Sequence, residues 1–596
     1  MQPSVSDFLV SRLREWGVER LYGYSGDGIN GFMSALRRAD GNPRLIQPRH
    51  EEVAAFMACG HAKFSDQVGV CVATSGPGAV HLLNGLYDAR KDHMPAVAIV
   101  GQQARKSLGT DYQQELDLMA LFKDVASEYV QMVTEPAQAR HVIDQAMRIA
   151  IARRTVTCVI LPNDVQDLPM EDPPREHGAV FSGVGYRFPQ QLPEPADLDA
   201  AAEILNRGEK VAILAGAGVK HAVEELIRVA DLTGAGIAKA ILAKTMVPDD
   251  LPGVTGAIGL LGTEASDRMM KECDTLLMVG TRFPYVEFLP EPGQARAVQI
   301  DVMPEALGVR YPTEINLHGD AGATLAALAE RLESKPNDKW RKKIQGWIDD
   351  WWEKTEARAA TEAKPINPQL VFQSLSPRLP ENVMIACDVG SATNWYARNL
   401  KIRQGMLGSV SGGLASMGNG VPYLIAAKFC HPDRPAIAMV GDGAMQMLGN
   451  NALITLAKYW QEWEDPRCII LVLNNHDLSQ VTWEQRVMEG DPKFDTSQEL
   501  PEFRYDQYAE LLGLKGLTMR EPDDIDRVWN EALTSDRPVV INAYTDSDIA
   551  PLPPHIEFEQ AKSYLASMLK GDSSGLHNAK LSAKQLGRSL FKRNKK

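Results

Sequence analysis

The chain has 596 residues, of which 44% are hydrophobic and 23% charged, an ordinary globular balance whose length suits three or four domains. Its formal net charge of −14 argues against nucleic acid as the main partner, because nucleic-acid backbones are themselves anionic. Seven cysteines without a C-x-x-C pair indicate a reducing compartment and no disulfide framework, so we expect a cytoplasmic protein.

The first predicted element is an amphipathic helix within residues 1–17, MQPSVSDFLVSRLREWG. Charges are spread through its apolar pattern, which is unlike the uncharged core of a signal peptide. The sequence contains no apolar run of about 18 residues, the length that a membrane-spanning helix needs. We therefore expect neither a signal peptide nor a membrane span.

Short apolar runs that end in Gly, Asp or Pro recur along the rest of the chain, with helix-like stretches between them. They begin at Val68, Ala96, Thr157, Val211, Thr275, Ala297, Val383, Ala436, Cys468 and Pro538. Continuous apolar runs of this length are typical of parallel strands that are covered on both faces. The pattern predicts an α/β protein with three open, mainly parallel sheets, whose ligands bind beyond the carboxyl ends of the strands.

Two segments interrupt this pattern and divide the chain. Residues 164–195 are rich in Pro, Gly and charge, which indicates a linker. Residues 335–365 form a charged, helix-like stretch in which Trp340, Trp347 and Trp351 share one face, and we expect this face to pack against a neighbouring domain. The predicted domains are 1–170, 195–335 and 366–555, with a tail over 556–596.

The sharpest motif is Gly441-Asp442-Gly443, followed thirty residues later by Asn474-Asn475, and both groups end apolar strands. Neighbouring strand ends can bring Asp442 and Asn475 together, and the backbone at Asp477 can add a third oxygen. Mg²⁺ prefers such oxygen ligands beside phosphate oxygens, and glycines let backbone N–H groups approach a diphosphate. A pair of ordinary strand-to-helix turns is the alternative, but the combined spacing favours a Mg²⁺–diphosphate site.

This segment resembles the thiamine diphosphate (ThDP) signature of the pyruvate oxidase and acetolactate synthase family. Asp388-Val389-Gly390-Ser391 is similar to the family's second diphosphate contact, and residues 411–418 to the stretch whose methionine, here Met417, wedges beneath the bent cofactor. Without this context Met417 would be a core filler. The resemblance implies that cofactor contacts in the last domain come from Asp388, Gly390, Ser391, Ala415, Ser416, Met417, Gly441, Asp442, Gly443, Ala444, Asn475, Asp477, Ser479 and Val481.

A second resemblance lies in Arg49-His50-Glu51-Glu52-Val53. In the family, the first Glu of such a run touches N1′ of the pyrimidine and activates the thiazolium carbon, which implies this role for Glu51. The chemistry requires a shielded carboxyl that shares a proton. Glu52 lies one helical position round and is expected to face elsewhere, and His50 is expected to be a structural hydrogen-bonding residue.

Further glycine-rich segments match the family in order along the chain. Gly26-Asp27-Gly28 resembles an early loop near the reacting carbon, and residues 75–78 and 84–89 also match. Each turn alone is a weak signal, but their order is specific. In the family, the first and third domains of different subunits hold one cofactor, so the resemblance implies a homodimer or homotetramer.

The middle domain carries a Gly216-Ala217-Gly218 turn between a strand and a helix, which can admit a dinucleotide phosphate. Further segments are similar to the FAD-contacting segments of the quinone-linked pyruvate dehydrogenase branch. They place FAD contacts at Gly256, Gly259, Thr281, Arg282, Phe283, Tyr285 and Asp301. FAD is therefore predicted, and the alternative is a purely structural domain, as in the decarboxylase branch.

Four side chains bear on the branch and the substrate. Glu484 matches a Glu of the pyruvate oxidase branch, where acetolactate synthases carry Trp, and Gln114 is the second residue of a stretch that is Phe-Gln-Glu in the oxidases. Gln113 and Gln480 replace two aromatic residues of the pocket wall. Buried amides need hydrogen-bond partners, so a more polar or larger 2-keto acid than pyruvate is one alternative.

The tail from Gly571 to Lys596 carries seven Lys or Arg residues against one Asp. Ala579, Ala583, Leu586 and Leu590 share one helical face, with basic residues mostly opposite. Such a helix can lie on an anionic membrane, and the quinone-linked dehydrogenases have a lipid-binding tail at this position. Peripheral contact with the inner face of the membrane and a disordered solubilising tail both remain open.

Three functions follow from these patterns. The first is a ThDP- and Mg²⁺-dependent enzyme that decarboxylates pyruvate or a related 2-keto acid and passes electrons through FAD to quinone or oxygen. The second is a non-redox carboligase or lyase of the acetolactate synthase type, with structural or absent FAD. The third is a non-catalytic protein that keeps the fold, which the joint presence of Glu51, Met417, Asp442 and Asn475 argues against.

Overall fold

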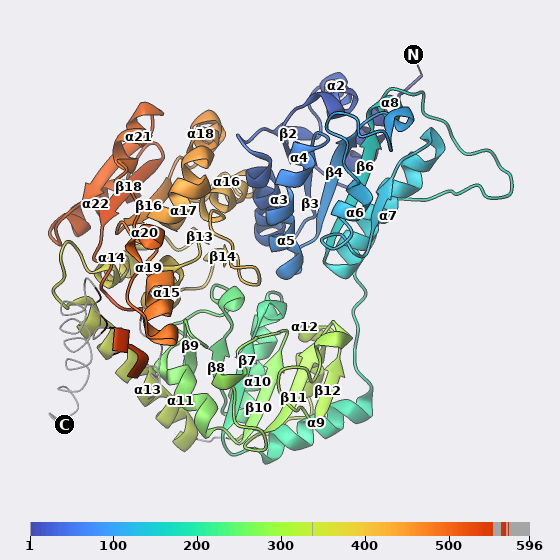
Figure 1. The fold of residues 1–596 in the computed structure, drawn as a ribbon. Coiled ribbons are helices and arrows are strands. Elements are labelled where there is room, and N and C mark those ends of the chain that lie inside the picture. The colour runs from blue at the N-terminus through green and yellow to red at the C-terminus, as the bar shows by residue number, and fades with distance from the viewer. Residues whose placement is uncertain are drawn as a thin grey trace.

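The computed structural model describes residues 2–335, 338–551, 562–564, 566–567, 570 and 572. These residues form three domains, each built around a six-stranded sheet, and Figure 1 shows the three sheets with helices covering their faces. The strand pairs within each sheet are parallel. The prediction of an α/β protein with three open, mainly parallel sheets is confirmed.

The first domain has the strand order β2-β1-β3-β4-β6-β5. Its strands are β1 (Arg20–Gly23), β2 (Arg44–Ile46), β3 (Gly69–Ala73), β4 (Ala96–Gln102), β5 (Val130–Met132) and β6 (Val156–Pro162). Its helices are α1 (Val5–Glu15), α2 (Asn30–Arg38), α3 (Glu51–Ser65), α4 (Pro77–His81), α5 (Leu83–Lys91), α6 (Leu118–Leu121), α7 (Ala139–Arg153) and α8 (Asn163–Gln166). An extended segment without helix or strand, 167–194, then leads to the next domain.

The central domain has the strand order β12-β11-β10-β7-β8-β9. Its strands are β7 (Val211–Ala215), β8 (Gly236–Lys239), β9 (Val254–Ala257), β10 (Thr275–Val279), β11 (Arg296–Asp301) and β12 (Ile315–His318). Its helices are α9 (Pro195–Arg207), α10 (Val223–Thr233), α11 (Glu264–Glu272) and α12 (Ala321–Ala329). Counted within the domain, this order is 3-2-1-4-5-6, the order of dinucleotide-binding α/β folds.

The third domain repeats the topology of the first, with the order β14-β13-β15-β16-β18-β17. Its strands are β13 (Met384–Cys387), β14 (Leu407–Val410), β15 (Ala436–Gly441), β16 (Cys468–Asn474), β17 (Lys515–Met519) and β18 (Val539–Tyr544). Its helices are α14 (Pro368–Leu375), α15 (Ser391–Asn399), α16 (Gly420–Cys430), α17 (Asp442–Ala444), α18 (Asn450–Tyr459), α19 (Ser479–Glu484), α20 (Asp495–Gln498), α21 (Tyr505–Leu511) and α22 (Asp524–Leu533).

Helix α13 (Asp338–Ala359) connects the central and third domains. Trp340, Trp347 and Trp351 on this helix are 3%, 8% and 3% exposed, and Trp340 and Trp347 join the core of the central domain. The predicted packing face is therefore confirmed. None of the described helices combines the length and apolar character needed to cross a bilayer, and the amphipathic part of the tail, 579–596, lies outside the described residues.

The strand order of each sheet determines where a ligand can bind. Ligands of open parallel sheets bind where the strand order reverses, beyond the carboxyl ends of the strands. The reversal falls between β1 and β3 in the first domain, between β7 and β10 in the central domain, and between β13 and β15 in the third. Each of these strand ends is followed by one of the glycine-rich turns found in the sequence.

A buried ion triad joins the central domain to the third. Lys239 and Lys244 donate to the two carboxylate oxygens of Asp249 over 2.6 and 2.7 Å, and all three side chains are at most 2% exposed. Asp249 also accepts a hydrogen bond from the backbone N–H of Ile402, and Lys244 donates to the carbonyl of Leu400. One carboxylate therefore accepts hydrogen bonds from two buried lysines and fixes the start of the segment that follows α15.

We predict that Asp249→Asn destabilises the protein by about 3–5 kcal/mol, because it leaves two buried ammonium groups without a counter-charge. Urea unfolding followed by tryptophan fluorescence measures this loss. The neighbouring exposed residue offers a matched control, and Asp250→Asn should leave the unfolding midpoint unchanged. Equal midpoints for the two variants would contradict the role given to the triad.

Candidate functional site

The carboxylate of Asp442 lies at the reversal point of the third sheet. Strands β15 and β16 run side by side, with Gly441 opposite Leu473, so the two motifs after them are adjacent. Asp442 is 3% exposed and accepts hydrogen bonds from the backbone N–H groups of Gly443, Asn475 and His476, at 2.9, 2.9 and 2.7 Å. Burial raises the pKa of Asp442 to about 7, against the lowering effect of these hydrogen bonds.

The neighbouring oxygens are arranged by short local contacts. The side-chain oxygen of Asn475 accepts from the backbone N–H of Asp477 over 3.0 Å, and its amide donates to Ser479. The carboxylate of Asp477 pairs with Lys493 at 3.0 Å and accepts from Thr482. Because this carboxylate is already occupied, the backbone carbonyl of Asp477 is the group of this residue left to act as a metal ligand, and that role stays a prediction.

The turns beside Asp442 fit a bound diphosphate and cation. A Cβ added at Gly390 or at Gly441 would meet no atom within 4 Å, so both turns are open at the strand ends. Gly390 precedes α15, whose first N–H groups are available to an anion. A divalent cation would also supply the positive charge that the buried carboxylate of Asp442 lacks among its hydrogen-bond partners. The donor set therefore suits Mg²⁺ held between Asp442, Asn475 and phosphate oxygens.

Asp388 has a different part from the direct contact that the sequence suggested. Its side chain is fully buried and accepts hydrogen bonds from the backbone N–H groups of Val389, Gly418 and Gly420 at 2.8–3.0 Å. Burial raises its pKa to about 6. Both carboxylate oxygens thus order the turn that ends the 411–418 loop, and Gly390 and Ser391 remain the groups of this motif that are predicted to contact a diphosphate.

The loop that carries Met417 is tied to the first domain. Asn84 donates to the hydroxyl of Ser416 and to the carboxylate of Glu52, at 2.8 and 2.6 Å. Ala415 adopts a left-handed backbone conformation, with φ of 55°. The methyl group of Met417 lies 3.2 Å from the position that a Cβ of Gly443 would take. Met417 therefore stands beside the metal turn, as a wedge beneath a cofactor requires.

Glu51 begins α3 in the first domain. The side chain of His50 caps this helix by accepting from the backbone N–H of Glu52, and two acidic residues in the first turn suit the helix dipole. Glu51 is 9% exposed, whereas the Glu52 side chain points to Asn84. A shielded carboxyl thus stands at the helix start, while its neighbour serves a structural contact.

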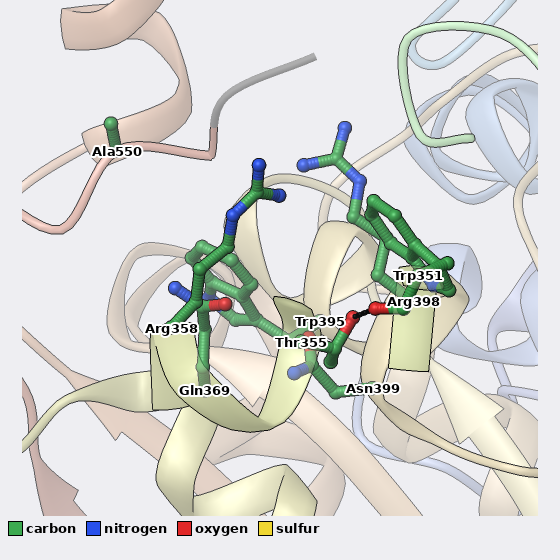
Figure 2. A pocket seen from close by; sticks show the side chains of 8 residues that line it. All are labelled: Trp351, Thr355, Arg358, Gln369, Trp395, Arg398, Asn399 and Ala550. Carbon is green, nitrogen blue, oxygen red and sulfur yellow. Dashed lines mark hydrogen bonds between the residues drawn. The ribbon is translucent and has the colours of Figure 1, made fainter. Parts of the chain in front are cut away.

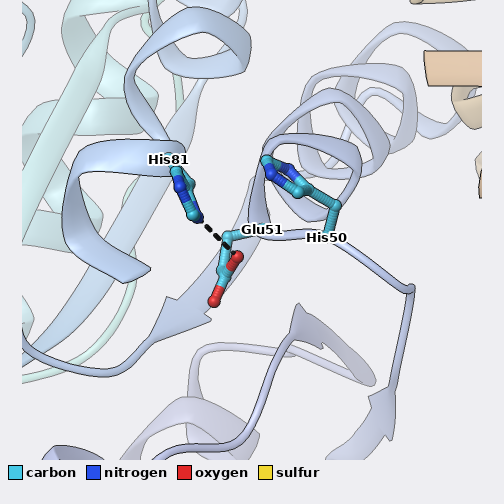
Figure 3. A group of neighbouring side chains, drawn as sticks. All are labelled: His50, Glu51 and His81. Carbon is cyan, nitrogen blue, oxygen red and sulfur yellow. Dashed lines mark hydrogen bonds and ion pairs between the residues drawn. The ribbon is translucent and has the colours of Figure 1, made fainter. Parts of the chain in front are cut away.

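His81 is the functional residue that sequence reasoning missed. Its Nδ1 lies 3.0 Å from a carboxylate oxygen of Glu51, and its ring lies 4.5 Å from that of His50, as Figure 3 shows. The ligand atoms of His50, Glu51 and His81 all lie within 4.8 Å of one another. His81 ends the short helix α4, which begins within the 75–78 turn. The closeness of this histidine to the turn in the sequence was the signal that could have identified it.

The early glycine loop packs against the 75–78 turn. A Cβ at Gly26 would lie 2.5 Å from Thr74, and one at Gly28 would lie 2.4 Å from Ser75, so only glycine fits at either position. The backbone N–H of Gly28 donates to Thr74 and to Asp27. These two turns and Glu51 therefore form one surface at the reversal point of the first sheet.

Two glutamines extend this surface. The hydroxyl of Ser75 lies 3.4 Å from the amide oxygen of Gln114 and 3.3 Å from the amide nitrogen of Gln103, a second residue that the sequence did not single out. Gln113 and Gln114 are exposed in the single chain. Among the described residues, no hydrogen bond joins Glu51 to Asp442 or Asn475, and the two halves of the candidate site belong to different domains.

A chain of amides lines the other half of the site. Asn394 on α15 donates to the amide oxygen of Gln480 over 2.8 Å, and Gln480 donates to Glu484 over 2.9 Å. Both polar ends of Gln480 are thus satisfied. Val481 beside it is 48% exposed. Further along, buried Arg486 makes two 2.8 Å hydrogen bonds to Asp572, which holds this residue against the helical turn that follows α19.

In the central domain, the two turns at the reversal point interlock. A Cβ at Gly218 would lie 2.6 Å from Gly280, so the glycines serve close packing of the turns after β7 and β10. Phe283 is buried and makes an edge contact with the exposed Tyr285, while Asp301 accepts from the N–H of Met303. The glycines at 256 and 259 adopt positive φ of 99° and 91°.

A cavity of about 560 Å³ opens beside these strand ends, between the central and first domains. Arg282 and residues 302–305 form its central-domain wall, and Arg90, Lys91, His93, Arg153 and Arg154 are among those facing them from the first domain. The volume lies in the range of small-molecule pockets. Its lining carries five Lys or Arg residues against Asp124, Glu128 and Glu305, and this excess of positive charge suits a phosphate-bearing ligand.

The fold and the three reversal points together define an enzyme class that binds a diphosphate cofactor through a metal and activates it with a buried carboxylate. Three domains of the thiamine pyrophosphate enzymes match the chain: the N-terminal TPP binding domain over residues 3–121, the central domain over 198–328 and the C-terminal TPP binding domain over 388–543. The chain therefore belongs to the thiamine pyrophosphate enzyme family.

Curated relatives align over most of their length. The Bacillus subtilis protein YdaP, named as containing thiamine pyrophosphate, is 35% identical over 98% of both chains. Pyruvate oxidase of Lactiplantibacillus plantarum is 29% identical over 91% of this chain and 89% of its own. Acetolactate synthase of Mycobacterium avium is also 29% identical, over 91% and 87%. The relatives thus include both a redox and a non-redox enzyme.

We predict that Asp442→Asn removes the rise in unfolding temperature that ThDP with Mg²⁺ produces in the wild-type protein, because the metal would lose the carboxylate ligand assigned to it. The loss of affinity should exceed the roughly 10–100-fold that follows removal of a supporting group. Thermal unfolding with and without ThDP and Mg²⁺ measures this. Asp526→Asn, on the exposed side of α22, should keep the full shift.

Proposed function

We propose that this enzyme oxidatively decarboxylates pyruvate or a related 2-keto acid, using ThDP and Mg²⁺, and passes electrons through FAD to quinone or oxygen. ThDP supplies, when bound, the carbon that attacks the keto group and holds the electron pair released with carbon dioxide. Asp442, Asn475 and the backbone of Asp477 hold the cation, while the turns at Gly390 and Gly441 receive the diphosphate.

The cavity beyond the carboxyl ends of the central sheet is the main support for the redox proposal. The strand order of this domain is that of dinucleotide-binding folds, and the cavity lies beyond the carboxyl ends of β10 and β11, next to the reversal between β7 and β10 where such ligands bind. Lys91, Arg153 and Arg154 offer charge for the diphosphate of FAD, whereas Arg90 and Arg282 are paired with acids of the same lining. Arg282, predicted as an FAD contact, lies on the wall that the central domain contributes.

Residues of the chain have separate roles at the reacting end of the cofactor. Glu51 offers a shielded carboxyl for proton exchange, and His81 within hydrogen-bond distance orients it. Met417 supports one side of the bent cofactor, and the glycine turns at 26–28 and 75–78 leave room on the other side. Because the two halves lie in different domains, we propose that a second copy of the chain completes each site.

The polar wall supports a substrate with hydrogen-bonding groups. Asn394, Gln480 and Glu484 form a continuous hydrogen-bonded row where a purely apolar side chain of a substrate would find few partners. Groups of a substrate that reach Gln480 or Glu484 can exchange hydrogen bonds with this row. We therefore propose that 2-keto acids with a polar side chain are turned over at least as well as pyruvate.

The second candidate is a non-redox carboligase or lyase, with FAD structural or absent. The acetolactate synthase among the relatives favours it. The two candidates differ in what happens to the flavin, since only a redox enzyme reduces it during turnover.

We predict that the purified protein binds FAD and that adding a 2-keto acid without oxygen bleaches the flavin absorbance. A panel of 2-keto acids, with a dye as electron acceptor and product analysis, identifies the substrate. A flavin that stays oxidised while a condensation product accumulates would establish the carboligase. Carbon dioxide release in step with dye reduction would establish the oxidative reaction.

We predict that Glu51→Gln still binds ThDP but loses most turnover, by about 10²–10⁴-fold, the contribution of a general acid or base. The neighbouring Glu52→Gln is the matched control, because a glutamine oxygen can still accept the hydrogen bond from Asn84. Steady-state rates at saturating ThDP separate the two. Near-wild-type rates for Glu51→Gln would refute the assigned role.

A further inference from the structure

Helix α5 of the first domain has a polar face that contacts the third domain. Asn84, Asp88 and Asp92 are four residues apart, so their side chains follow one another along one side of the helix and its C-terminal cap. Asp88 and Asp92 are 0% and 3% exposed. The partner of this face is the segment that follows β14 and carries Met417, residues 411–418, which we call the Met417 loop. At the opposite end of β14's domain, the residues drawn in Figure 2 surround a separate small pocket and take no part in this contact.

The end of the polar face holds the start of the Met417 loop. Asp92 accepts hydrogen bonds from the backbone N–H groups of Gly412 and Gly413 at 2.9 and 2.5 Å, and it pairs with Lys63 at 2.6 Å. A Cβ added at Gly413 would lie 2.7 Å from the last carbonyl oxygen of α5. The loop therefore packs directly on the C-terminal end of this helix.

Asp88, one turn earlier on α5, fixes the shape of the loop. It accepts a hydrogen bond from the hydroxyl of Ser411 at 2.6 Å, and the oxygen of that hydroxyl accepts from the backbone N–H of Ser416 at 2.9 Å. The hydroxyl of Tyr423 on α16 also donates to Asp88. A buried carboxylate of the first domain thus closes a turn in a loop of the third.

Asn84, a further turn earlier, uses both hydrogens of its amide group in this arrangement. It donates to the carboxylate of Glu52 at 2.6 Å and to the hydroxyl of Ser416 at 2.8 Å. Glu52 directly follows Glu51, and Ser416 directly precedes Met417. One amide therefore links the residue beside the shielded carboxyl to the residue beside the proposed wedge.

We propose that Asn84 is a positioning residue for the cofactor, which acts through Ser416 to hold Met417 where it meets ThDP. Asp92 and Asp88 fix the start of the Met417 loop, whereas Asn84 acts on the end that carries the methionine. Without Asn84 this end would have to be ordered when the cofactor binds, which lowers the affinity. The inference rests on the proposed wedge role of Met417, and it holds for either candidate reaction.

Hydrogen exchange of the cofactor-free protein, followed by mass spectrometry, tests the positioning directly. Asn84→Ala should speed exchange in the peptide that covers the Met417 loop and leave the peptide that covers β15 unchanged, because the contact is local. Asn206→Ala is the matched control, since it removes another asparagine whose amide makes two hydrogen bonds, in the central domain. It should leave the exchange of the Met417 loop at the wild-type rate.

Titration with ThDP at saturating Mg²⁺, followed by tryptophan fluorescence, measures the affinity for the cofactor. Asn84→Ala should bind ThDP about 3–10-fold more weakly, the equivalent of about one net hydrogen bond, and Asn206→Ala should bind it as the wild type does. Ser416→Ala should lose less affinity in the Asn84→Ala background than alone, because both changes break the same contact. Ser416→Thr, which keeps the hydroxyl, should restore most of the affinity that Ser416→Ala loses.

A wild-type exchange rate of the Met417 loop in Asn84→Ala would overturn this inference and leave the cofactor site in place, and so would affinity losses that multiply in the double variant. A wild-type protein that takes up no ThDP would overturn the cofactor site together with the inference. If Asn84→Ala does not fold, Ser416→Ala breaks the same contact from the loop side. Faster exchange of the loop in that variant is then the expected result, and an unchanged rate would reject the role of Asn84.

Discussion

Three backbone N–H groups hold one buried carboxylate at the carboxyl ends of the strands of the third sheet, and the candidate site is arranged around this interaction. Asp442 receives these hydrogen bonds from its own turn and from the turn after β16, so it locks two strand ends together. The same burial that raises its pKa to about 7 leaves it in need of a cation. The residue that we propose as a metal ligand therefore also holds the two strand ends together.

The topology repeats this arrangement at the other sheets. In the first domain the reversal point brings together the 26–28 loop, the 75–78 turn and Glu51, and in the central domain it joins the turns at Gly216 and Gly280. Buried polar contacts then set the domains against one another: the Lys239–Asp249–Lys244 triad between central and third domains, and Asn84 with Ser416 between first and third. The sheets place the candidate site residues at the strand ends, and these contacts between domains hold the domains in a fixed arrangement.

Much of this was predictable from sequence because the signals are local. Apolar runs of strand length and the turns that follow them predicted the three sheets and placed Asp442 and Asn475 at adjacent strand ends. The pairing of His81 with Glu51 and the use of Asp388 to order the 418–420 turn were not predictable in the same way. These contacts depend on side chains from separate elements, whose approach no spacing in the sequence specifies.

In the proposed site, Asp442 and Asn475 hold the metal of a cofactor whose other end reaches Glu51. A crystal structure with ThDP and Mn²⁺ in place of Mg²⁺ tests it most directly, because manganese gives an anomalous signal. We predict a manganese peak about 2.1 Å from side-chain oxygens of Asp442 and Asn475, with Glu51 of the first domain touching the pyrimidine. A peak among His50, Glu51 and His81 instead would contradict the account.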